Sequence, residues 1–112
     1  MGYDLHITRK EFWEDDEGPA ITLADWAAYV ETDPAITLDP ENPGGENYVF
    51  RYGQHSWPLW WDDSGEVYTR HPEPEVIAKL VQVAAALGAR VLGDDGELYG
   101  SDPSDPTKPV TP

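Results

Sequence analysis

Three histidines and a large number of clustered carboxylates are the side chains with which this sequence could do chemistry. The histidines are His6, His55 and His71, and their wide separation lacks the close spacing of a typical zinc motif. Residues 62–68 and 94–99 both read Asp-Asp, turn, Glu, aliphatic, Tyr. Paired carboxylates can bind calcium or magnesium, but Asp and Gly are also the residues that tight turns require. We interpret both segments as hairpin turns and expect neither a metal site nor a cofactor.

Catalytic motifs give no support for an enzyme. The chain has no Cys, and it lacks the G-x-S-x-G, P-loop, G-x-G-x-x-G and H-E-x-x-H patterns. His55 and Ser56 are neighbours, but adjacent strand residues point to opposite faces of a sheet. We therefore predict a non-enzymatic protein without catalytic residues. The alternative is a small metal- or ligand-dependent enzyme that uses His6, His55 and clustered carboxylates.

The segment 57–61 holds three of the five tryptophans and is the best candidate for a binding surface. In a strand, Trp57 and Trp61 would share one face, and Trp60 would lie on the other. If helices cover a single face of the sheet, Trp60 is partly exposed, and exposed aromatics ringed by charge are typical of interface hot spots. The alternative is that a loop within residues 39–45 covers Trp60. The candidate binding residues are Trp57, Trp60, Trp61, Asp62, Asp63, His55, Glu14, Asp15, Asp16 and Glu17.

Charge is the strongest compositional signal. The chain carries 22 Asp and Glu against seven Lys and Arg, for a formal net charge of −15. Such a field repels phosphate backbones and anionic lipids, and it attracts basic proteins. We therefore expect a basic protein partner, no nucleic acid and no membrane. The alternative is that the acidity serves solubility alone.

Two amphipathic segments predict helices. The first spans 22–32, with Thr22 as its N-cap and Asp25 placed to complete a capping box. The second spans 74–87, begins at a proline and ends before Gly88, which suits the left-handed C-terminal position.

The remaining apolar segments predict strands. They cover 3–9, 48–52, 57–62, 66–70, 90–92 and 97–99, whereas Ile36 to Leu38 forms either a brief strand or a plug in the core. Pro58 indicates a bulge or an edge position, because it cannot donate to a ladder. The predicted fold is α+β, in the order β-α-β-β-β-α-β-β, with a mostly antiparallel sheet of four to six strands and two helices on one face. We expect a single domain over residues 1–100 and a disordered, Pro-rich tail over 101–112.

Three stretches carry a resemblance: the YDLHITR sequence at 3–9, the helix start at 21–26, and 87–97, which contains LGARV and GDDGE. They resemble a family of small uncharacterised bacterial proteins with a YDLHITR-type start and a LGARV-GDDGE-type end. The resemblance implies a bacterial cytoplasmic protein and brings no activity and no site residues. In size and acidity the chain is also similar to immunity proteins that neutralise toxins.

Cytoplasmic location is further expected because the first residues have no signal-peptide pattern and the longest apolar stretch is too short to span a bilayer. The leading hypothesis is an acidic, immunity-like module that occludes a basic partner protein or toxin, as a monomer or weak homodimer. A nucleic-acid mimic is a further alternative.

Overall fold

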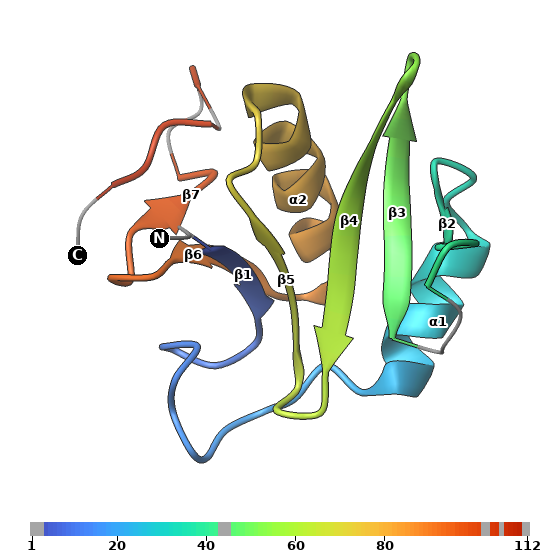
Figure 1. Ribbon diagram of the computed structural model, residues 1–112. Helices are drawn as coiled ribbons and strands as arrows, with labels where there is room; N and C mark the ends of the chain where they lie inside the picture. Colours follow the sequence, from blue (N-terminus) through green and yellow to red (C-terminus); the bar gives the residue numbers. More distant parts are fainter. Residues whose placement is uncertain (1–3, 43–45, 102–103, 106, 111–112) are drawn as a thin grey trace.

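The computed structural model describes residues 4–42, 46–101, 104–105 and 107–110. Within these residues, seven strands form one antiparallel sheet in the order β2-β3-β4-β5-β1-β6-β7, and two helices accompany it. Figure 1 shows the arrangement. The elements in chain order are β1 (Asp4–Thr8), α1 (Leu23–Glu31), β2 (Ile36–Leu38), β3 (Asn47–Tyr52), β4 (His55–Asp62), β5 (Glu66–Arg70), α2 (Pro74–Leu87), β6 (Arg90–Gly93) and β7 (Leu98–Tyr99). The α+β prediction is confirmed. The sheet has one strand more than expected, because the segment at Ile36 pairs with β3 instead of only filling the core.

Both helices cover the same face of the sheet, and the core lies between the two layers (Figure 1). Strand β1 contributes Leu5 and Ile7 to this core, and α1 contributes Trp26, which is fully buried. The largest share comes from α2, whose buried side chains are Val76, Leu80, Val83, Ala84 and Leu87. No helix of the described residues lies on the opposite face, which we call the open face.

The helix ends are those that the sequence predicts. The Thr22 hydroxyl accepts a hydrogen bond from the Asp25 amide at 3.0 Å, and the Asp25 carboxylate accepts from the Thr22 amide at 3.4 Å, which completes the capping box. Helix α2 begins at Pro74 and ends at Gly88, which has a φ of 64°.

Strand β4 is an interior strand, so the prediction of an edge position for Pro58 is wrong. The proline is nevertheless accommodated, because the ladder between β4 and β5 covers only Trp60 to Asp62 and does not reach it. The Thr69 hydroxyl donates to the Pro58 carbonyl at 2.6 Å and joins the two strands there. The local surroundings of Pro58 on the β5 side therefore resemble an edge.

The last strand extends the sheet toward the C-terminus. Leu98 and Val110 form an antiparallel bridge with hydrogen bonds of 2.8 and 2.9 Å. Of the tail for which we expected disorder, residues 102–103, 106 and 111–112 lie outside the described part of the chain. Within the described residues, neither helix combines the length and the apolar composition that a bilayer crossing requires.

Candidate functional site on the open face

The tryptophans of β4 divide between the two faces of the sheet, as the alternation predicts. Trp57 and Trp61 pack against the core. Their indole N–H groups donate to the backbone carbonyls of Arg70 and Ile21, at 3.1 and 2.9 Å. These two side chains hold the fold together, and the structure places them away from the open face.

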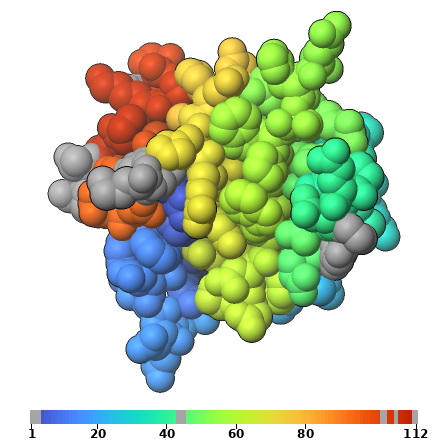
Figure 2. All heavy atoms as spheres, in the orientation of Figure 1, coloured from blue at the N-terminus to red at the C-terminus, as the bar shows by residue number. Residues whose placement is uncertain are grey.

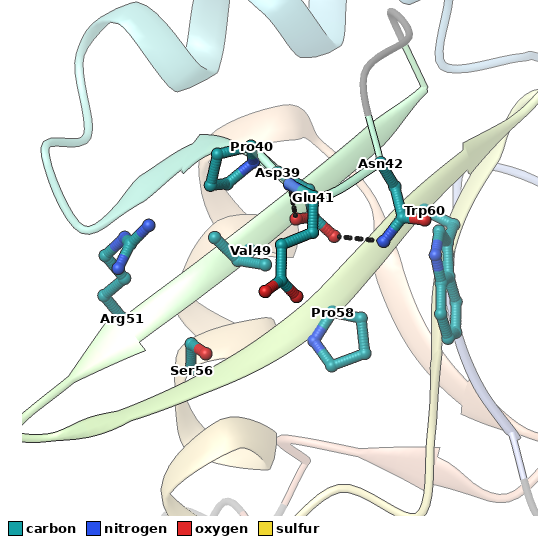
Figure 3. Close-up of a pocket in the computed structure, with 9 residues that line it drawn as sticks. All are labelled: Asp39, Pro40, Glu41, Asn42, Val49, Arg51, Ser56, Pro58 and Trp60. Atoms are coloured by element: carbon teal, nitrogen blue, oxygen red, sulfur yellow. Dashed lines mark hydrogen bonds between the residues drawn. The ribbon is translucent and has the colours of Figure 1, made fainter.

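Trp60 lies on the open face and is half-buried. Its ring centroid is 5.3 Å from that of Tyr68, and its indole N–H makes no hydrogen bond to another described residue. The loop around Asp39 and Asn42 borders a hollow of about 540 Å³ beside it, as Figure 3 shows. Trp60 is thus partly exposed beside the described part of this loop, as the sequence predicts, and residues 43–45 of the loop lie outside the described part of the chain.

A second hollow on this face, which we call the acidic depression, collects most of the predicted charged residues. It has a volume of about 440 Å³ and lies between the loop after β1 and the β4–β5 turn, at the lower left of Figure 2. Its described lining residues are Lys10, Trp13, Glu14, Asp15, Asp16, Asp62, Asp63, Ser64 and Glu66. Six carboxylates therefore converge from two segments about 50 residues apart in sequence.

One cation, Lys10, stands against these six carboxylates in the described lining. Lys10 is buried, and its ammonium group donates to the Asp15 backbone carbonyl at 2.8 Å. Besides the three tryptophans, two predicted residues lie outside the depression: Glu17 is exposed but does not line it, and His55 begins β4 at the end opposite Asp62. The structure thus unites the two acidic segments but leaves His55 apart from them.

Local geometry fixes the β4–β5 turn against the preceding loop. The Gly65 amide donates to the Asp62 carbonyl at 2.9 Å, and the Ser64 hydroxyl donates to the Asp62 carboxylate at 2.9 Å. Gly65 has a φ of 94°, and its own carbonyl accepts from the Ile21 amide at 2.9 Å. The segment after β6 also turns, with the Gly96 amide donating to Gly93. Both Asp-Asp segments are therefore turns, as predicted.

The sequence offers His6 only as a candidate for the alternative enzyme and does not reveal its surroundings. It lies on the open face of β1, yet only 3% of it is exposed. Its Nδ1 is 3.0 Å from the Glu66 carboxylate, and its Nε2 is 2.9 Å from the Asp94 carboxylate. The Trp13 ring stacks on the imidazole at a centroid distance of 3.8 Å and an angle of 3°. The indole N–H of Trp13 also donates to the Asp94 backbone carbonyl at 3.2 Å, which holds the indole ring over His6.

This arrangement favours a charged imidazole in the metal-free protein. Burial lowers the pKa of His6, but the hydrogen bonds and charges of Glu66 and Asp94 outweigh burial and raise the pKa above 6.5. Both ring nitrogens then donate, each to a carboxylate. A histidine on the polar face of a strand is ordinarily at the surface, and it is buried here because the loop after β1 folds back over it.

A possible metal-binding group occurs at the same place. Asp4, His6 and Asp94 each offer one donor atom, and these atoms lie within 4.8 Å of one another. In the described part of the chain, neither His55 nor His71 belongs to this group. The histidines therefore do not converge, and His6 meets carboxylates instead.

Comparisons of the chain with protein-family models, with curated proteins and with solved structures found no match.

Proposed function

We propose that this chain is a non-enzymatic protein-binding module, immunity-like in character, that occludes a basic surface of a partner protein or toxin with its open face. The observation that carries the proposal is the acidic depression, where six carboxylates converge and the lysine of the lining is buried, with its ammonium group donating to the Asp15 backbone carbonyl. Convergent negative charge steers a basic partner during encounter and fixes its register once it is bound.

Aromatic side chains beside the depression supply apolar contact area for such a complex. Trp60 is half-buried, and its ring packs against that of Tyr68 at a tilt of 42°, which holds it in place before binding. A rigid aromatic surrounded by charge loses little conformational entropy on binding, which is the usual character of an interface anchor. No described residue accepts a hydrogen bond from the indole N–H of Trp60, whereas those of Trp57 and Trp61 donate to backbone carbonyls.

The same surface gives no support to nucleic acid or membrane binding, because it presents carboxylates to phosphate groups. Acidity for solubility alone requires a net charge and does not require convergence of charges at one hollow. The two explanations differ in what they predict for carboxylates at different places on the molecule.

The test is binding to the product of a neighbouring gene, after co-expression and purification of both proteins. One variant neutralises the depression from both sides, Asp16→Asn/Asp63→Asn. Its matched control, Glu31→Gln/Glu75→Gln, neutralises two exposed carboxylates on the helices. Both variants change the net charge from −15 to −13, since each loses two negative charges.

Exposed charge pairs are worth about 0.2–1 kcal/mol each, so the depression variant is expected to bind roughly two- to thirtyfold more weakly. The control should bind within twofold of the original chain. The affinity of the original chain should also fall between about 50 and 500 mM NaCl, because salt screens the attraction. Equal weakening of both variants, or no complex with any neighbouring gene product, would contradict the proposal.

A further inference from the structure

We propose that Asp4, His6 and Asp94 form a binding site for one divalent transition-metal ion, for which Zn²⁺ is the best fit. The inference does not depend on the proposed function. The three donor atoms lie within 4.8 Å of one another. Two come from β1 and the third follows β6, a strand that pairs directly with β1. The Asp4 amide also donates to the Asp94 carboxylate at 3.1 Å, so the backbone holds the two carboxylates in register.

The orientation of His6 is that of a metal ligand. Its Nδ1 is hydrogen-bonded to Glu66, which is only 6% exposed, and its Nε2 therefore points toward Asp94. In metal sites the ring nitrogen that does not bind the metal commonly donates to a carboxylate, which fixes the tautomer and the direction of the free lone pair. Trp13 stacked on the ring prevents it from tilting. Metal binding would release the Nε2 proton to solvent, and the Nδ1–H would continue to donate to the Glu66 carboxylate.

A second observation comes from Asp4. Its Oδ1 atom is buried and has no hydrogen-bond partner among the described residues. The Arg70 Nε lies 3.3 Å away as an ion pair without hydrogen-bond geometry, and the Arg70 side chain is 63% exposed. Such a surface pair is weak, and a buried carboxylate oxygen without a donor is costly. A bound cation would satisfy this oxygen.

The donor set decides the class of ion. One imidazole nitrogen and two carboxylate oxygens suit Zn²⁺ and neighbouring first-row ions, whereas Ca²⁺ and Mg²⁺ prefer oxygen donors throughout. Two carboxylates with a neutral imidazole also balance the charge of a divalent ion. Three protein donors leave a position for water or a ligand. The Asp94 side chain is 33% exposed, which gives access from solvent.

The test uses the full chain, freed of metal with EDTA and dialysed. Isothermal titration with Zn²⁺ is expected to show one ion bound per chain, and Co²⁺ should give visible absorption bands of an ordered site. Asp4→Asn and Asp94→Asn should each weaken binding at least about tenfold, and Glu66→Gln should weaken it roughly 10–100-fold by loosening His6. The matched control Asp63→Asn removes a carboxylate of the acidic depression and should leave the affinity unchanged. Circular dichroism confirms that each variant is folded.

Three results would overturn the inference. The first is the lack of saturable binding to the original chain at millimolar Zn²⁺. The second is unchanged affinity in both Asp4→Asn and Asp94→Asn. The third is equal weakening in Asp63→Asn, since this outcome indicates diffuse attraction of cations to an acidic surface. Because Asp4 is partly exposed and its backbone bond to Asp94 survives substitution, Asp4→Asn keeps the test decisive if Asp94→Asn fails to fold.

Discussion

Replacing Glu66 by glutamine tests whether the buried contact with His6 is a charge-assisted bond. The substitution keeps the shape of the side chain and removes its charge. The Nδ1–carboxylate contact is 3.0 Å, with 4% and 8% of the two side chains exposed, so solvent screening reduces it little. A hydrogen bond to a charged group contributes about 1.5–3 kcal/mol, and a neutral one about 0.5–1.5 kcal/mol. The expected loss in the free energy of unfolding is therefore about 1–2 kcal/mol.

For a domain of this size, such a loss lowers the melting temperature by roughly 4–16 °C. The assay is thermal unfolding followed by near-ultraviolet circular dichroism, in EDTA so that a bound metal does not contribute. Glu14→Gln is the matched control, because it makes the same chemical change at an exposed position and should alter stability by less than about 0.5 kcal/mol. Wild-type stability in Glu66→Gln would refute the charge-assisted bond.

The remaining predictions concern exposure, acid stability and the turn. The fluorescence that is lost in Trp60→Phe comes from Trp60. Relative to free tryptophan, caesium should quench this fluorescence more strongly than iodide does, because Asp39 and Glu41 line the hollow beside Trp60 and the net charge is −15. Equal relative quenching by the two ions would contradict this. Burial raises the pKa of Asp33, but bonds from Lys79 and its other neighbours outweigh burial and lower the pKa below 3.8. The ionised Asp33 therefore stabilises the fold above pH 3.8, and this contribution should be lost as the pH falls below that value. Asp33→Asn should make the acid-unfolding curve less steep in this range. Gly65→Ala should destabilise by at least about 1–3 kcal/mol in urea unfolding, because φ is +94° and the new Cβ would lie 2.5 Å from that of Ala20; an unchanged midpoint would contradict this.

The sequence predicts the helices well because their signals are local. Thr22 and Asp25 lie three residues apart, and the bonds between them form within a single turn. Pro74 and Gly88 likewise act through their own backbone conformations. The order of the strands is different, because it depends on pairings between distant segments. Nothing in the pattern of β1 indicates that it lies between β5 and β6.

The candidate site was likewise predictable only where its geometry depends on residues close together in the sequence. Strand alternation correctly separates Trp60 from Trp57 and Trp61, since it requires only neighbouring residues. The environment of His6 depends on partners 60 and 88 residues away and on a loop that covers the ring. Such long-range contacts leave no spacing that a single sequence can display.

The most direct test of the proposed function is to map the bound partner on the chain by nuclear magnetic resonance. We expect the amide signals of residues 10–16 and 62–66, together with the indole N–H of Trp60, to shift on addition of the basic partner. Signals of α1 and of α2, on the other face of the sheet, should stay in place. Shifts confined to the helices, with the acidic depression unaffected, would contradict the account.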